Sequence, residues 1–79
     1  MPVTLYSKNR CVQCEATKRY LDEHGVEYRE VNMSDEPEAL EYVKSLGYLQ
    51  APVVVTKDLT WSGFNPGYLD AFTAGLKAA

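Results

Sequence analysis

The chain has 79 residues, of which 46% are hydrophobic and 24% are charged, and its net charge is −3. This composition excludes wholesale disorder, and the length leaves room for one domain and not for a two-domain enzyme. A nucleic-acid-binding domain of this size usually carries a basic excess, which this chain lacks. The longest apolar run, residues 51–55, is far shorter than the ~20 residues of a membrane span. We therefore expect neither nucleic acid nor a membrane as a partner.

The first residues of the chain bear on its cellular location, and its two cysteines bear on its chemistry. Residues 1–8 lack the long apolar stretch of a secretory signal, so the sequence predicts a cytoplasmic protein. Cys11 and Cys14 are three residues apart, and a disulfide between them would close a very short loop that stabilises a fold little. Such a bridge would not persist in a reducing compartment. Close cysteines in the cytoplasm are more often redox-active or metal-binding.

The first half of the chain predicts a strand, a helix, a strand and a second helix. Residues 3–6 are β-prone, and residues 11–24 repeat apolar positions near the helical period, with Gly25 as a left-handed stop. Residues 27–33 alternate as a strand. Asp35 and Glu38 have the spacing of a capping box, and Pro37 suits the first turn of a helix that ends at Gly47.

The second half predicts two strands and a final helix. Residues 51–55 are a buried-type strand led by a proline, and a short strand surrounds residues 60–62. Asn65-Pro66 is an N-cap followed by an N1 proline, and the helix after it carries Leu69, Phe72 and Leu76 on one face. The order β-α-β-α-β-β-α predicts parallel strands where a helix joins them and an antiparallel hairpin at the end.

The segment Cys11-Val12-Gln13-Cys14 lies where the first predicted strand and its loop lead into a helix. Only a thiolate attacks a disulfide, and the free N–H groups and dipole of a helix N-terminus favour that anion. Lys8 and Arg10 add two cations beside it. We therefore expect Cys11 to be the attacking thiol and Cys14, one turn inside, to resolve the mixed disulfide.

Other interpretations of these residues stay open at this point. A structural zinc site needs four ligands, and besides the cysteines the chain offers only the distant His24, so a zinc or iron–sulfur centre would have to be shared across a dimer. The cysteines could also be inert and buried. Pro52 is either a cis proline or an ordinary strand-start proline. Trp61 and Phe64 are either core residues or an exposed apolar patch for a partner.

Two segments of the sequence resemble a known family. A strand running into Tyr6-Ser7-Lys8, followed by C-x-x-C at a helix start, resembles the thioredoxin fold, and the element order is similar to its short glutaredoxin version. Cys11-Val12-Gln13-Cys14 together with Trp61-Ser62-Gly63-Phe64-Asn65-Pro66 resembles the NrdH-redoxin family over essentially the whole chain. The resemblance implies an α/β thioredoxin fold, a four-stranded mixed sheet flanked by three helices, in one domain of residues 1–79.

The resemblance also implies a function. NrdH-redoxins are hydrogen donors to the large subunit of class Ib ribonucleotide reductase in deoxyribonucleotide synthesis. They are recharged by thioredoxin reductase with electrons from NADPH, and no bound cofactor or metal is implied. Cys11 would be the nucleophile and Cys14 the resolving thiol. The active-site support would come from Lys8, Arg10, Val12, Gln13 and a cis Pro52. The partner would bind a patch beside the cysteines formed by Trp61, Ser62, Gly63 and Phe64.

The chain departs from the family pattern at two positions. Asn9 stands where the family often has proline, which predicts a less rigid loop, and Asn65 stands where it usually has arginine. The main alternative is a glutathione-dependent glutaredoxin, which typically has T-V-P and G-G-x-D-D segments. Here Gln50-Ala51-Pro52 and Gly63-Phe64-Asn65-Pro66 replace them, and the missing carboxylate counts against a site for the glutathione amine. A metal or iron–sulfur carrier is the less favoured alternative.

Overall fold

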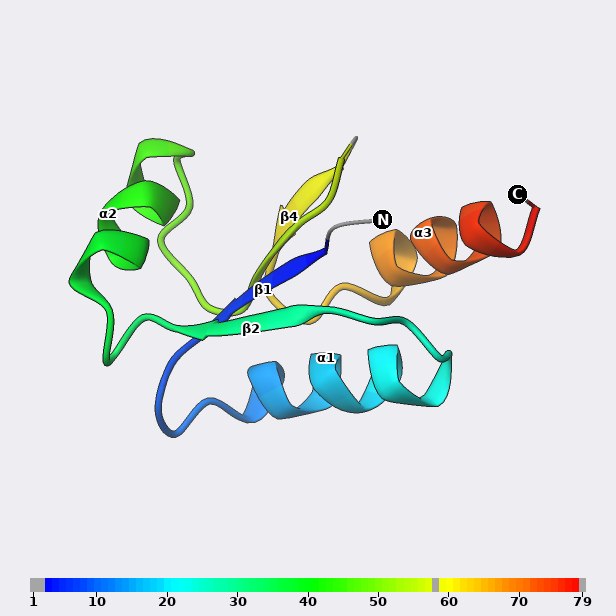
Figure 1. Ribbon diagram of the computed structural model, residues 1–79, viewed down its shortest axis with the longest axis horizontal. Helices are drawn as coiled ribbons and strands as arrows, with labels where there is room; N and C mark the ends of the chain where they lie inside the picture. The colour runs from blue at the N-terminus through cyan, green and yellow to red at the C-terminus, as the bar shows by residue number, and fades with distance from the viewer. Residues whose placement is uncertain (1–2, 58, 79) are drawn as a thin grey trace.

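The computed structural model describes residues 3–57 and 59–78 (Figure 1). Its elements follow the predicted order β-α-β-α-β-β-α: β1 Thr4–Ser7, α1 Val12–Glu23, β2 Arg29–Asn32, α2 Pro37–Ser45, β3 Val53–Val55, β4 Thr60–Ser62 and α3 Pro66–Ala78. The four strands form one mixed sheet in the order β2-β1-β3-β4. The predicted four-stranded sheet with three helices is therefore confirmed. Among the described residues, no helix combines the length and apolar character that a membrane-spanning segment needs.

The direction of β3 differs from the prediction. β1 and β2 are parallel, as expected for strands joined by a helix, but β3 is antiparallel to β1 although α2 joins it to β2. β2 ends at Asn32, opposite Ser7, and β3 begins at Val53, opposite Tyr6. The chain thus enters β3 at the same end of the sheet at which it left β2. The short α2 stands at that end of the sheet and does not carry the chain back along it (Figure 1).

The helices cover opposite faces of the sheet, and each face has its own apolar cluster. The cluster on the side of α1 and α3 is the larger and contains Val3, Leu5, Leu21, Val54, Trp61, Leu69 and Phe72. The cluster on the side of α2 contains Met33, Val43 and Val53. Of the predicted apolar face of α3, Leu69 and Phe72 are buried, and Leu76 lies outside the side chains that the structure describes.

Most helix ends follow the predicted stop and start signals. Gly25 and Gly47 end α1 and α2 with positive φ values of 67° and 91°, a conformation that glycine adopts without a steric cost. The predicted capping box of Asp35 is wrong, because α2 begins one residue later with Glu36 as its N-cap and without a side-chain cap bond. The backbone N–H of Asp35 instead donates to the carbonyl of Asn32 at 3.1 Å, which closes a turn before the helix.

A polar network joins β1, β2 and α1 on the face of the sheet that α1 covers. The Ser7 hydroxyl donates to Glu30 Oε2 at 2.8 Å, and Lys18 Nζ donates to the same oxygen at 3.1 Å. The bond from Ser7 favours the charged carboxylate, as does the contact with Lys18, and together they hold the pKa of Glu30 below its ordinary value of 4.5. Lys18 also pairs with Glu15 at 2.9 Å.

This network predicts a pH dependence of stability. The folded carboxyl of Glu30 binds protons more weakly than the unfolded one, so its contribution is full above about pH 4.5 and is lost as the pH falls through the lowered pKa. We expect Glu30→Gln to reduce the loss of unfolding free energy between about pH 5 and about pH 3. Urea unfolding at both pH values measures this loss of free energy. The control is Glu27→Gln, because Glu27 is exposed and lies outside the network. If Glu30→Gln lost as much unfolding free energy as the wild-type protein over this pH range, the polar network would not be the source of the acid sensitivity.

Candidate functional site

The sheet register brings four chain segments, which are far apart in the sequence, to one end of the molecule. β1 leaves the sheet at Ser7 and β2 leaves it at Asn32, its partner in the register. β3 enters at Val53, directly after Pro52, and β4 leaves at Ser62, which pairs with Val53. The loop before α1, the turn before α2, the proline and the segment after β4 therefore meet around one site.

Cys11 and Cys14 form a disulfide at the beginning of α1, with their Cα atoms 5.2 Å apart. Cys11 is the N-cap of the helix, and its Sγ accepts the backbone N–H of Cys14 at 3.0 Å. Cys11 is half-buried, whereas Cys14 is 1% exposed. The more accessible sulfur is therefore the one at which a helix N–H points, an arrangement that favours a thiolate on Cys11 once the disulfide is reduced.

Gln13 connects the dithiol turn to the segment after β4. Its Oε1 accepts the backbone N–H of Phe64 at 3.0 Å, across 51 residues of sequence. The same oxygen would lie 3.3 Å from a Cβ atom at Gly63, which has a φ of 77°. Gly63 therefore allows both the bend after β4 and the close approach of the Gln13 side chain.

Pro52 lies against this segment from the other side. The Ala51–Pro52 peptide bond is cis, as the resemblance implied, and the proline is buried. Its carbonyl accepts the backbone N–H of Gly63 at 2.7 Å. Through these bonds the dithiol turn, the cis proline and the Gly63–Phe64 bend form one connected structure.

The two aromatic residues of the predicted partner patch have different environments. Trp61 is 2% exposed, stacks on Tyr68 at a centroid distance of 5.5 Å and packs against Phe72 at 6.1 Å. Phe64 is 39% exposed. The expectation of an exposed patch is therefore wrong for Trp61, because β4 turns its side chain onto the face that α1 and α3 cover. Phe64, which follows the bend, is exposed as expected, whereas Ser62 is half-buried and Gly63 is buried. That this segment binds a partner stays a prediction.

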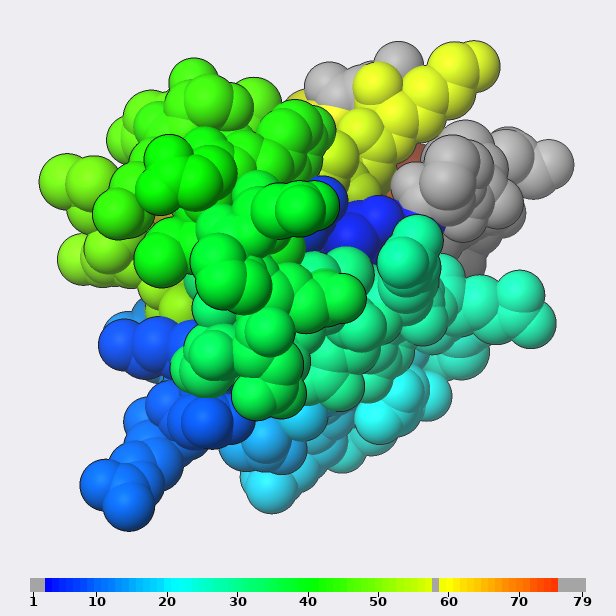
Figure 2. Space-filling view, turned by 60° about the vertical axis from the view of Figure 1, so that its left-hand side comes forward, coloured from blue at the N-terminus to red at the C-terminus, as the bar shows by residue number. Residues whose placement is uncertain are grey.

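The loop between β1 and α1 carries the predicted cations. Lys8 and Arg10 are both exposed, and Val12, the residue after the first cysteine, is 85% exposed. Arg10 has a φ of 56°, in the left-handed region that side chains other than glycine rarely adopt. Figure 2 shows this blue segment projecting from the molecular surface. The cations thus lie on an exposed rim beside the disulfide.

A groove between Lys8 of the loop before α1, the helix α2 and the connector before Pro52 includes residues that the sequence pattern did not single out. It has a volume of about 310 Å³ and is lined by Lys8, Met33, Ser34, Leu40, Val43, Lys44, Tyr48, Leu49, Gln50 and Ala51. Leu49 is 91% exposed although it is a large apolar residue. The sequence predicts only a connector there. The one sequence feature that could have drawn attention to Leu49 is its position three residues before Pro52, in a connector that leads to the site.

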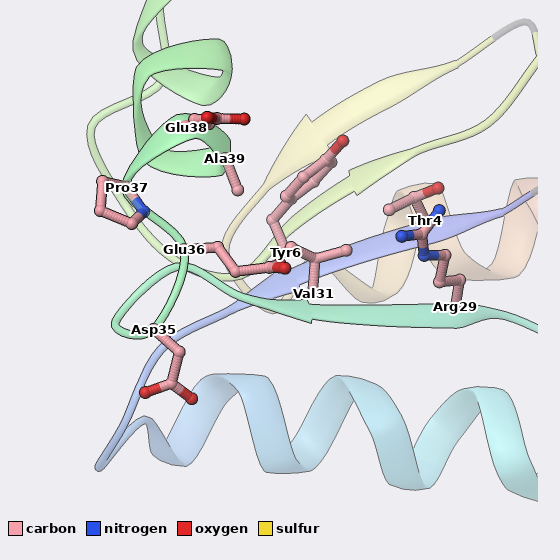
Figure 3. A pocket seen from close by; sticks show the side chains of 9 residues that line it. All are labelled: Thr4, Tyr6, Arg29, Val31, Asp35, Glu36, Pro37, Glu38 and Ala39. Carbon is pink, nitrogen blue, oxygen red and sulfur yellow. The ribbon is translucent and has the colours of Figure 1, made fainter.

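A second hollow lies on the α2 side of the sheet and contains neither cysteine. Figure 3 shows Thr4, Tyr6, Arg29 and Val31 on the strands and residues 35–39 around them. Burial raises the pKa of Tyr6, the aromatic residue of this hollow. The carboxylates at its rim do not form a metal-binding group, and no group of three such side chains occurs in the described part of the chain.

Comparison with known proteins agrees with this architecture. Residues 3–60 match the Glutaredoxin family. The chain is 43% identical over 79 residues to the Glutaredoxin-like protein NrdH of Escherichia coli K12, covering 100% of this chain and 98% of that protein. It is 43% identical over 67 residues to the Glutaredoxin-like protein NrdH of Lactococcus lactis subsp. cremoris, covering 85% and 93%.

A solved structure of the glutaredoxin-like protein NrdH-redoxin from Escherichia coli, described by its thioredoxin-like activity profile, is similar with a TM-score of 0.87. The identity is 42%, and the match covers 90% of this chain and 93% of that one. The fold predicted from the family resemblance is thereby confirmed. The chain belongs to the NrdH-redoxin group of the glutaredoxin family and is a small thiol redox protein with a redox-active cysteine pair.

Proposed function

We propose that this protein is a dithiol–disulfide electron carrier that donates hydrogen to class Ib ribonucleotide reductase and is recharged by thioredoxin reductase. The observation that carries the proposal is the disulfide at the start of α1, where the accessible Cys11 caps the helix and Cys14 lies buried behind it. Membership of the NrdH-redoxin group supports the choice of partners. The exchange takes place in the cytoplasm, where such a disulfide is repeatedly reduced.

The reaction moves two electrons and two protons from one dithiol to another disulfide. The Cys11 thiolate attacks one sulfur of the target disulfide, forms a mixed disulfide and releases the other sulfur, which takes up a proton. Cys14 then loses its proton and attacks Cys11 Sγ, which closes the internal disulfide and releases the second target thiol. The dithiol of thioredoxin reductase reverses these steps, with NADPH as the source of the electron pair.

The contacts around α3 favour a protein reductase over glutathione. Glutathione would need donors for its carboxylates and an anion for its amine near the helix start. The N–H of Phe64 is already bonded to Gln13, and Asn65 Oδ1 accepts the N–H of Tyr68 at 3.3 Å. Residues 62–68 contain no carboxylate. This segment therefore offers no anion for the glutathione amine, and the N–H of Phe64 is not free to bind a glutathione carboxylate.

Exposed apolar side chains around the disulfide support docking of a protein. Val12 and Leu49 are 85% and 91% exposed, and Phe64 is 39% exposed. They belong to three of the four segments that meet at this end of the sheet: the start of α1, the connector before Pro52 and the bend after β4. Large apolar residues that flank a reactive group in this way are typical of a protein-binding surface.

The source of electrons tests the proposal directly. We expect NADPH consumption to be far faster with thioredoxin reductase than with glutathione and glutathione reductase. The exposed apolar side chains near the dithiol can bind a protein reductase, whereas no carboxylate in residues 62–68 can bind the glutathione amine. Both assays use the same protein concentration and the same disulfide acceptor. Rapid reduction by millimolar glutathione, with none by thioredoxin reductase, would overturn the proposal and favour the glutaredoxin alternative.

Phe64→Ala separates docking from dithiol reactivity. We expect this variant to lower kcat/KM with thioredoxin reductase about tenfold, because an apolar anchor of an interface commonly contributes 1–2 kcal/mol or more. Its reduction by dithiothreitol should be unchanged. Tyr42→Ala is the matched control, since Tyr42 is 44% exposed and its ring packs on Tyr6, which lines the hollow that contains neither cysteine. Equal losses with both reductants would show that Phe64 serves the dithiol itself.

A further inference from the structure

Three polar residues tie the dithiol loop to the turn before α2, and we call them the asparagine clasp: Asn9, Asn32 and Ser34. The backbone N–H of Asn9 donates to Ser34 Oγ at 3.0 Å. Asn32 Nδ2 donates to Asn9 Oδ1 at 2.9 Å, and the backbone N–H of Ser34 donates to Asn32 Oδ1 at 2.8 Å. The three bonds close a ring between segments that are 23–25 residues apart in sequence.

The clasp continues the sheet beyond the point where its strands separate. The last register pair of β1 and β2 is Ser7 with Asn32, and the N–H of Met33 still donates to the Ser7 carbonyl at 2.7 Å. After this point one chain turns toward α1 and the other toward α2, and the two lie side by side in Figures 1 and 2. The Asn32 carbonyl also accepts the N–H groups of Asp35 and Glu36 at 3.1 Å. Asn32 is therefore a fixed anchor for the loop.

The clasp ends two residues before Cys11. Between them lies Arg10, whose φ of 56° is costly for a residue with a side chain and persists only where its surroundings hold it. On the other side, Cys11 Sγ is held by the N–H of Cys14 at 3.0 Å. The strained residue is thus fixed from both sides, by the clasp and by the helix cap.

We propose that the asparagine clasp positions Cys11 for attack, by holding the loop so that its sulfur stays on the Cys14 N–H and the thiolate remains favoured. Asn9, Asn32 and Ser34 are positioning residues in this role and act through the backbone of residues 10–11. The inference rests on the proposed function in one respect, the assignment of Cys11 as the attacking thiol.

The clasp bears on the expectation that Asn9 leaves the loop less rigid than proline would, because Asn9 makes two bonds that proline could not make. Proline has no N–H and could not donate to Ser34 Oγ, nor could it accept the bond from Asn32 with a side chain. Asn9 therefore replaces the stiffness of a proline ring with two hydrogen bonds to a neighbouring segment.

The alkylation rate of the reduced protein as a function of pH tests this role. We expect wild-type protein to be alkylated by iodoacetamide first at Cys11. In Asn32→Ala the pH midpoint should rise by about one unit, so that the rate at about pH 7 falls roughly threefold to tenfold as the thiolate fraction falls. The rate at high pH should be unchanged, because the sulfur remains accessible.

The neutral variants keep the local charges constant. The charged groups of the neighbouring segments are Lys8 and Arg10 in the loop, Glu15 on α1, Asp35 and Glu36 before α2, and Lys44 on α2, which lines a groove together with Lys8 and Ser34. None of them is altered. A change of midpoint therefore reports the position of the sulfur. Thermal unfolding of each variant is measured in parallel to separate this effect from a general loss of stability.

Matched variants complete the test. Ser34→Thr keeps the hydroxyl acceptor and should retain the wild-type midpoint, whereas Ser34→Ala should shift it in the same direction as Asn32→Ala. Ser45→Ala removes a side-chain bond to the Tyr42 carbonyl on α2 and should leave the midpoint unchanged.

The experiment distinguishes a failure of the clasp proposal from a failure of the assignment of Cys11 as the attacking thiol. An unchanged midpoint in both Asn32→Ala and Ser34→Ala, with Cys11 still labelled first, would overturn the clasp and leave the proposed function intact. Preferential labelling of Cys14 in the wild-type protein would instead contradict the assignment of the attacking thiol.

Discussion

Cys14→Ser is expected to stop turnover after about one exchange per molecule and to trap a covalent complex with the large subunit of class Ib ribonucleotide reductase. Cys11 still attacks the target disulfide, but the buried position behind it no longer supplies a thiol to break the mixed disulfide. The intermediate has no internal exit and accumulates. Non-reducing electrophoresis and mass spectrometry of the adduct measure this result.

Cys11→Ser is the matched control for the trapping experiment. It retains a thiol only at Cys14, which is 1% exposed, so we expect no adduct and no turnover. Dithiothreitol should release the complex formed by Cys14→Ser and restore the free variant. Trapping by Cys11→Ser, with none by Cys14→Ser, would reverse the two roles. The absence of an adduct with either variant would contradict the proposed acceptor.

Trp61→Ala is expected to lower the free energy of unfolding by about 3–5 kcal/mol, the usual cost of truncating a buried aromatic residue. Trp61 is 2% exposed and packs between Tyr68 and Phe72 in the larger cluster. For a domain of this size the loss corresponds to a fall in Tm of roughly 12–40 °C. Thermal and urea unfolding of the oxidised protein measure it.

Trp61→Phe distinguishes the ring from its N–H group. The Nε1 atom of Trp61 is buried without a hydrogen-bond partner among the residues that the structure describes. Phenylalanine removes this unpaired donor while keeping an aromatic ring, so we expect a smaller loss of about 1–2 kcal/mol. If Trp61→Ala were as stable as wild type and lost only turnover by thioredoxin reductase, the side chain would have to reach the partner after all.

Local patterns in the sequence determined the elements and the chemistry of the dithiol. The period of the apolar residues, Gly25 and Gly47 as stops, and Asn65 with Pro66 as a start are short-range signals, and the structure has helices and turns at these places. The C-x-x-C spacing at a helix start also needs no distant residue to define it. These features depend on neighbours within about one helical turn, which the sequence displays directly.

The tertiary structure decided that Trp61 is buried and that Phe64 is exposed. Trp61 and Phe64 are equally apolar and three residues apart, and a strand of three residues has too few positions for its alternation to identify the buried face. The face is fixed only when Trp61 pairs with Val54 of β3, whose side chain lies in the larger cluster. Phe64 escapes burial because Gly63 turns the chain after the strand.

The contacts that shape the site were also decided by the tertiary structure. Gln13 meets Phe64 across 51 residues, and Asn9 meets Asn32 across 23. Polar residues in loops carry no periodic signal, since each is compatible with solvent as well as with a partner. Their pairing follows from the strand register, which brings the ends of β1, β2 and β4 and the start of β3 to one edge. Register depends on side chains from several strands at once, so these contacts exist only in the folded sheet.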